Sequence, residues 1–122
     1  MKKLLVVDDS LLIHTLCRQL LGQARDVSLS FAKNGAEALA AIAAQGEPGL
    51  ILLDVNMPVM DGLECLRQLG ERGVSKRVPV VIISTEGEED DVRRGLEGGA
   101  RAYLRKPFKF HELRAIVDQM LG

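Results

Sequence analysis

The sequence is poor in aromatic residues, which make up 3% of its 122 residues as three Phe, one Tyr and no Trp. Sites for single-stranded nucleic acid stack the bases on aromatic side chains, so such a site has little to build on here. Lys and Arg number 16 against 17 Asp and Glu, which leaves a net charge of −1. Because no excess of positive charge is present, we expect no direct contact with nucleic acid.

Cysteines and long apolar runs are also scarce. The chain has two cysteines, Cys17 and Cys65, whereas disulfide frameworks use more and zinc sites use close pairs, so we expect buried packing residues. The longest apolar runs fall well short of the roughly 20 residues that a membrane-spanning helix needs, and no signal peptide opens the chain. These absences predict a cytoplasmic protein that is not inserted in a membrane.

Short aliphatic runs alternate with segments of helical period. Five runs predict strands, at residues 4–7, 27–31, 50–53, 80–83 and 102–104. The longer runs are apolar on both faces and rich in β-branched residues, which is typical of central strands in a parallel sheet covered on both sides.

Five helices are predicted between and after these strands, three of them beginning at the capping residues Ser10, Asn34 and Asp61. Their apolar stripes are Leu12, Leu16 and Leu20 flanked by Ile13, Cys17 and Leu21; Leu39, Ile42 and Ala43; Leu63, Leu66 and Leu69; Val92 and Leu96; and Leu113, Ile116, Val117 and Met120. The helix near residues 88–98 has only two large apolar residues, so we expect it to be held weakly. Five β-α units predict an α/β fold, with a five-stranded parallel sheet doubly wound as (βα)5.

Polar residues stand where the predicted strands end. They are Asp8 and Asp9, then Asp54, then Ser84 and Thr85, and finally Lys106. Right-handed crossovers bring these strand ends to one edge of the sheet, where carboxylates this close repel one another unless a cation joins them. An oxygen-only donor set suits Mg²⁺, and Lys106 would neutralise part of the remaining charge. Helix capping is the alternative for Asp8 and Asp9, but it leaves Asp54 and Lys106 unexplained.

Four sequence motifs at these strand ends resemble those of the receiver domain of two-component response regulators, of the stand-alone chemotaxis type. They are Val6-Val7-Asp8-Asp9-Ser10, Leu53-Asp54-Val55-Asn56-Met57-Pro58-Val59-Met60-Asp61-Gly62, Ile83-Ser84-Thr85 and Lys106-Pro107-Phe108. The resemblance covers the whole chain in order. It implies a flavodoxin-like three-layer sandwich and one receiver domain over residues 1–122, with no output domain.

The resemblance also implies the roles of the site residues. Asp54 would be the phosphoacceptor, and Mg²⁺ would be bound by Asp9, Asp54 and the backbone carbonyl of Asn56, with Asp8 helping through a water. Lys106, joined to Pro107 by a cis bond, would pair with the phosphoryl oxygens.

Ser84 and Tyr103 occupy the two switch positions of the family. The Ser84 hydroxyl would turn inward to the phosphoryl group, and Tyr103 would follow it between outward and inward rotamers. We expect the output surface on the helix near 88–98, the strand at 102–104 and the last helix. The implied partners are a histidine kinase or histidine phosphotransfer protein and an unidentified output protein. The chain would catalyse only its own phosphorylation and dephosphorylation, as a monomer or weak dimer.

Three residues are expected to tune the phosphorylated lifetime. Asn56 and Glu86 together resemble the chemotaxis-type regulators that lose phosphate quickly, which predicts a lifetime of seconds to minutes. Thr85 would lengthen the phosphorylated lifetime, since a residue larger than the usual Ala narrows the access of water to Asp54. For Glu86 the alternative is a solvated loop acid.

Both histidines are predicted to be solvated helix residues. His14 takes a position where the family often has an exposed Arg, and its alternative role is to carry a phosphoryl group. His111 lies in the first turn of the last helix and is expected to be equally uninvolved.

Two other classes of protein share parts of this pattern. Phosphatases of the haloacid dehalogenase type also form an aspartyl phosphate, but they use an acid two residues after the nucleophile, where this chain has Asn56. Flavin-binding electron carriers of the same fold hold a phosphate in the loop after the first strand, where Asp8 and Asp9 would repel it.

Overall fold

All five predicted strands form one parallel sheet in a computed structural model, which describes residues 2–21, 26–85 and 88–121. The strands are β1 (Lys2–Val7), β2 (Val27–Ala32), β3 (Leu50–Asp54), β4 (Val80–Ser84) and β5 (Ala102–Arg105). Their order is β2-β1-β3-β4-β5 and every neighbouring pair is parallel, so the predicted doubly wound sheet is confirmed.

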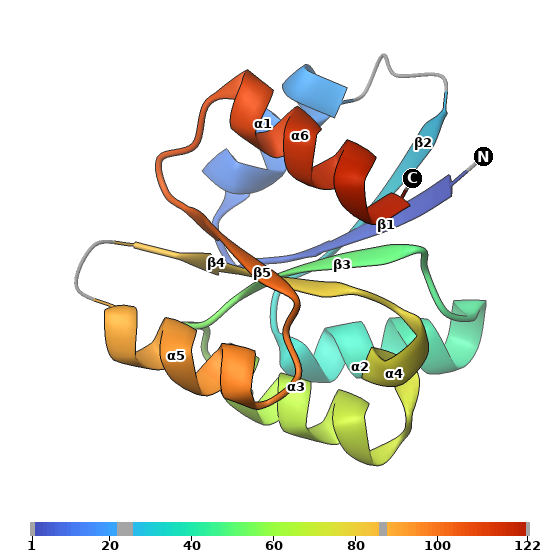
Figure 1. The fold of residues 1–122 in the computed structure, drawn as a ribbon. Coiled ribbons are helices and arrows are strands. Elements are labelled where there is room, and N and C mark those ends of the chain that lie inside the picture. The colour runs from blue at the N-terminus through green and yellow to red at the C-terminus, as the bar shows by residue number, and fades with distance from the viewer. Residues whose placement is uncertain (1, 22–25, 86–87, 122) are drawn as a thin grey trace.

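Helices cover both faces of the sheet and make three layers (Figure 1). They are α1 (Leu11–Leu21), α2 (Gly35–Gln45), α3 (Gly62–Glu71), α4 (Val74–Arg77), α5 (Glu89–Glu97) and α6 (Phe110–Leu121). α1 and α6 lie on one face, and α2 to α5 lie on the other. The four-residue helix α4 was not predicted, because one helical turn is too short to show a periodic pattern.

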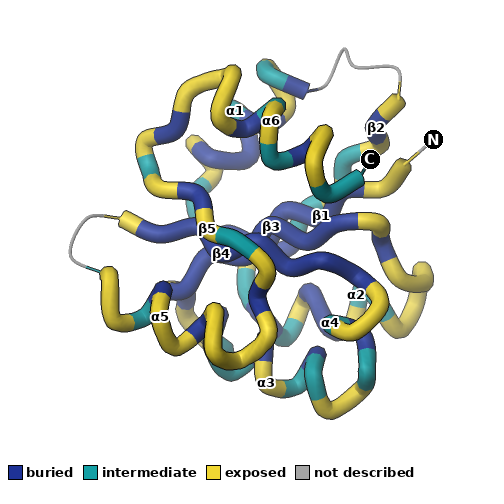
Figure 2. Tube along the Cα trace, in the orientation of Figure 1, coloured by how far each residue is buried: buried dark blue, intermediate teal, exposed yellow. Residues whose placement is uncertain are grey.

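The core has two halves, because alternate residues of each central strand point to opposite faces of the sheet. In β3, Ile51 and Leu53 pack toward α2 and α3, whereas Leu50 and Leu52 pack toward α1 and α6. Figure 2 shows β3 and β4 as buried along their whole length, whereas the edge strands β2 and β5 are partly exposed. The apolar runs therefore predicted the strands correctly.

The predicted helix caps are present. The side-chain oxygens of Asn34 and Asp61 each accept a bond of 2.9 Å from the backbone N–H three residues later. Ser10 Oγ accepts a longer bond of 3.4 Å from the N–H of Ile13. These bonds satisfy N–H groups that have no partner within the helix, which is why α1, α2 and α3 begin where they do.

The two apolar stripes predicted for α1 are confirmed except at Leu12, and Leu16 and Leu20 are partly buried against the core. Ile13, Cys17 and Leu21 are buried, whereas Leu12 is 75% exposed. The two leucine-containing stripes are adjacent on the helix, and only its packing against the sheet decides which stripe faces inward. On α2 the expected core residue Ala43 is likewise exposed. None of the helices within the described ranges is both long and apolar enough to cross a membrane.

The order of the strands creates a topological switch point at the carboxyl ends of β1 and β3. From β1 the chain first moves outward to β2 and then returns past β1 to β3, so the connections diverge at the carboxyl ends of β1 and β3. Doubly wound sheets bind their ligands at such a switch point. Asp8 follows β1 and Asp54 ends β3 at this point.

Candidate functional site

Three carboxylates meet at the switch point. One side-chain oxygen from each of Asp8, Asp9 and Asp54 lies within 4.8 Å of the other two. Asp8 is fully buried and Asp54 is 5% exposed, while Asp9 is exposed. The predicted cluster is therefore assembled, and Asp9 is its member nearest to solvent.

Lys106 reaches the cluster from the loop after β5. Its Nζ lies 2.7 Å from Asp8 Oδ2 and 3.6 Å from Asp54 Oδ1, and the bond to Pro107 is cis as expected. Burial works to lower the pKa of the Lys106 ammonium, but Asp8 and Asp54 outweigh it and raise that pKa. Lys106 is thus a permanently charged cation in a cluster with three acids.

One cation is not enough for three carboxylates. Burial, followed by the negative charge of Asp8, raises the pKa of Asp54 to about 7, although the charge of Lys106 opposes the shift. Glu88 and Asp9 add smaller contributions in the same direction. The site is therefore short of positive charge around the buried Asp54 carboxylate.

The donor set fits a hard divalent cation. Among the described residues, the group that could hold a metal consists of three carboxylates without histidine or cysteine, and Mg²⁺ prefers one or two carboxylates plus water. An added cation would also relieve the repulsion that raises the pKa of Asp54. Asn56, two residues after Asp54, is exposed in the loop after β3, and its role as a ligand stays a prediction.

A glycine allows α3 to begin against the backbone of Asp54. The Gly62 N–H donates a 2.9 Å hydrogen bond to the Val55 carbonyl. A Cβ on Gly62 would lie 2.2 Å from the backbone oxygen of Asp54, which is closer than a non-bonded carbon can approach an oxygen. The Asp-Gly pair at 61–62 thus caps the helix and lets it lie against the end of β3.

The two predicted switch residues have opposite environments. Ser84 is fully buried at the end of β4, and its Oγ has no hydrogen-bond partner among the described residues. Tyr103 on the edge strand β5 is 47% exposed. The backbone N–H of Lys106 donates to the Ser84 carbonyl at 2.6 Å, so the hydroxyl and the ammonium belong to one connected edge.

Glu88 is a site neighbour that the sequence interpretation missed. Its carboxylate accepts hydrogen bonds from the Thr85 backbone N–H and from Thr85 Oγ1, the latter at 2.7 Å. The spacing Thr-x-x-Glu at 85–88 resembles a capping box in sequence, but the N-cap of α5 is Glu88 itself, so this contact closes the loop before the helix. Thr85 is exposed, its effect on access to Asp54 stays a prediction, and Glu86 lies outside the described residues.

The prediction of a solvated His14 was wrong. The side chain is 4% exposed, and its Nε2 lies 2.7 Å from the backbone oxygen of Asp8. The rotation of α1 that exposes Leu12 turns His14 toward β1, which helical periodicity alone did not reveal. His111 is exposed as predicted, and Cys17 and Cys65 are buried free thiols.

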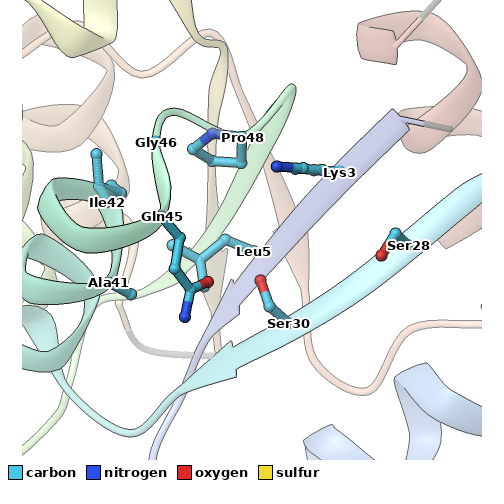
Figure 3. Close-up of a pocket in the computed structure, with 9 residues that line it drawn as sticks. All are labelled: Lys3, Leu5, Ser28, Ser30, Ala41, Ile42, Gln45, Gly46 and Pro48. Carbon is cyan, nitrogen blue, oxygen red and sulfur yellow. The ribbon is translucent and has the colours of Figure 1, made fainter.

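A hollow lies away from the acids, near the amino ends of β1 and β2 (Figure 3). It has a volume of about 130 Å³ and is lined by Lys3, Leu5, Ser28, Ser30, Ala41, Ile42, Gln45, Gly46 and Pro48. Small side chains on β2 and α2 leave this space, and it contains none of the predicted site residues.

The doubly wound sheet with an acidic cluster and a lysine at its switch point is the architecture of a receiver domain. A family model described as the response regulator receiver domain matches residues 4–118. The chain therefore belongs to the response regulator receiver domain family, whose members are signalling modules switched by phosphorylation.

Individual relatives agree with this assignment. Chemotaxis protein CheY1 of Helicobacter pylori is 31% identical over 98% of this chain and 97% of its own length. The nitrate/nitrite response regulator NarL of Escherichia coli is 37% identical over 95% of this chain, which spans 53% of NarL. The high-resolution structure of chemotaxis response regulator CheY4 of Vibrio cholerae superimposes with a TM-score of 0.87, at 33% identity and 99% coverage of both chains.

Proposed function

We propose that this chain accepts a phosphoryl group on Asp54 from a histidine kinase or a histidine phosphotransfer protein. The observation that carries the proposal is the convergence of Asp8, Asp9, Asp54 and Lys106 at the switch point of the sheet. Phosphoryl transfer depends mainly on positioning and on cations around the charged oxygens, and this cluster is arranged for both.

The transfer uses the Asp54 carboxylate as the nucleophile. One carboxylate oxygen attacks phosphorus, the phosphorus–nitrogen bond of the donor phosphohistidine breaks, and its electron pair stays on the imidazole nitrogen. Lys106, already 3.6 Å from Asp54, pairs with a phosphoryl oxygen. Mg²⁺ bound by Asp9, Asp54 and the Asn56 carbonyl, with Asp8 acting through a water, would shield the phosphoryl charge.

Dephosphorylation is the chain's own hydrolysis of the acyl phosphate. Water attacks phosphorus, the bond to the Asp54 oxygen breaks, and inorganic phosphate leaves. We infer that Asn56 and Glu86 promote this attack and that Thr85 slows it, with a phosphorylated lifetime of seconds to minutes. The hydrogen bond from Thr85 Oγ1 to the Glu88 carboxylate supports a fixed orientation of the Thr85 side chain.

The added phosphoryl group switches the fold through Ser84 and Lys106. It brings a charge of about −2 and three acceptor oxygens next to a buried hydroxyl that has no partner among the described residues. A hydrogen bond to a charged group contributes roughly 1.5–3 kcal/mol, so one new bond shifts a two-state equilibrium by roughly tenfold or more.

The α5–β5–α6 face is the proposed output surface. α5 buries only Val92 and Gly95, so it is the easiest of the longer helices to move. Leu96 and Tyr103 are 40% and 47% exposed beside a hollow of about 340 Å³. Arg105 on β5 lies 3.6 Å from Glu89 on α5, a surface ion pair that movement of α5 would alter.

Labelling with acetyl phosphate tests the proposal. We expect intact mass spectrometry to show one phosphoryl group in the presence of Mg²⁺, and none in excess chelator or in Asp54→Asn. Asp118→Asn removes the same charge from an exposed carboxylate on α6 and should label like the wild type. A wild-type chain that is folded but stays unlabelled, or an Asp54→Asn variant that is labelled, would contradict the proposal.

A further inference from the structure

We infer that His14 is a positioning residue for the carboxylate loop after β1 and that its hydrogen bond to Asp8 sets the affinity for Mg²⁺. The inference rests on the metal site of the proposed function. It concerns a residue that takes no part in the phosphoryl transfer described above.

The contact is a directed hydrogen bond. His14 Nε2 lies 2.7 Å from the backbone oxygen of Asp8, and both residues are buried. A carbonyl oxygen only accepts hydrogen bonds, so Nε2 carries a proton and donates it. The bond joins the first turn of α1 to the loop that follows β1.

The Asp8 carbonyl needs this donor. The last residue of β1 that pairs in the sheet is Val7, opposite Ala32 and Leu53, and the Asp8 N–H still bonds to the Ala32 carbonyl at 3.0 Å. The Asp8 carbonyl lies beyond these pairs in a buried position. A buried carbonyl without a partner is costly, and His14 supplies the partner from α1.

The imidazole ring also contacts an aromatic ring. Its centroid lies 4.8 Å from that of Phe31 on β2, at an interplanar angle of 38°. The His14 backbone N–H donates to the Ser10 carbonyl at 3.2 Å, which fixes the ring's own helical turn. Arg18 covers Phe31 with its guanidinium carbon 4.5 Å from the ring centroid. The donor therefore has a defined direction.

The loop after β1 carries the proposed Mg²⁺ ligands Asp8 and Asp9. The hydrogen bond from His14 therefore acts on residues that would bind the cation. Asp8 Oδ1 accepts from the Ser10 N–H at 2.9 Å, and Oδ2 forms the ion pair with Lys106. With His14 on the backbone oxygen, the orientation of the peptide unit between Asp8 and Asp9 is determined. Asp9 is exposed, so few side-chain contacts fix its carboxylate. The orientation of the Asp8–Asp9 peptide unit therefore determines where that carboxylate lies relative to Asp54.

Isothermal titration with Mg²⁺ on His14→Leu and His14→Gln tests the inference. Leu fills similar space without a donor, whereas the Gln amide can donate from a similar reach. Since loss of a group that orients a metal ligand typically weakens binding 10–100-fold, we expect at least about a tenfold higher Kd for His14→Leu and a change within about threefold for His14→Gln. His111→Leu, which removes an exposed histidine on α6, should match the wild type.

The outcomes separate this inference from the proposed function. If His14→Leu is folded by circular dichroism and binds Mg²⁺ like the wild type, the inference fails and the metal site stands. If both His14 variants lose affinity equally, the role is packing and the inference also fails. If the wild type does not bind Mg²⁺, both ideas fall. Nitrogen-15 NMR of the wild type should show His14 protonated on Nε2, and an unprotonated Nε2 would overturn the inference directly.

Discussion

Replacing Asp54 with Asn should change how the stability of the metal-free protein depends on pH. In the folded chain, burial and the charge of Asp8 raise the pKa of Asp54 from 3.8 to about 7. An acid with a raised folded-state pKa destabilises the fold once it ionises. The penalty is nearly absent below about pH 4, grows between about pH 4 and 7, and stays constant above pH 7.

The magnitude follows from the same pKa. Each factor of ten in protonation equilibrium is worth 1.36 kcal/mol, so a rise from 3.8 to about 7 sets an upper bound of about 4 kcal/mol. Asp54 is 5% exposed, which limits screening by water, but relaxation of its coupled neighbours reduces the full effect. We expect Asp54→Asn to be more stable than the wild type by about 2–3 kcal/mol at pH 7.5, and by less than about 1 kcal/mol at pH 4.

Urea unfolding in excess chelator, repeated from pH 4 to 8, measures this difference. The denaturant slope should be the same for both proteins, so that the midpoint alone changes. Asp118→Asn is the matched control, and an exposed ion pair of this kind contributes at most about 1 kcal/mol. A stability difference between Asp54→Asn and the wild type that is independent of pH would refute the electrostatic reasoning. Saturating Mg²⁺ should stabilise the wild type far more than the variant.

Three further predictions concern the backbone and the thiols. Val59 has a φ of +67°, which is strained for a β-branched residue, and its side chain is 84% exposed and contributes little packing. Val59→Gly should therefore raise the free energy of unfolding by about 0.5–1 kcal/mol in urea titrations, and Val59→Ala by less. Gly62→Ala should lower that free energy by about 1–3 kcal/mol and reduce labelling of Asp54, whereas Gly70→Ala in the same helix, where a Cβ would meet only a hydroxyl at 3.7 Å, should not destabilise the fold. Burial raises the pKa values of the two cysteine thiols to about 11 and about 12, so a disulfide reagent at pH 8 should modify them only after unfolding; rapid reaction of the native protein would contradict this.

The strands were predictable because their signal is local. A buried parallel strand must be apolar on both faces, and β3 and β4 are buried at every residue. The helix caps were equally local, since Asn34 and Asp61 bond to residues three positions away. The short helix α4 has no comparable local pattern, and its start depends on Gly73, whose φ is +76°.

The site was predictable only as far as its residues follow the strand ends. Asp8, Asp54 and Lys106 are adjacent in space because the chain topology brings the carboxyl ends of β1, β3 and β5 to one edge. His14 and Glu88 do not end a strand. Their contacts with Asp8 and Thr85 depend on how a helix is rotated and how a loop closes.

By itself, the sequence determined the alternation of strands and helices, the helix starts and the identity of the charged residues at the strand ends. These features depend on periodicity and on bonds between near neighbours, which a linear chain already contains. Tertiary structure alone decided that His14 is buried against Asp8, that Leu12 faces outward and that Ser84 Oγ is left without a partner among the described residues. These outcomes follow from the packing of whole elements against one another, and a rotation of α1 by a single position would have reversed the first two.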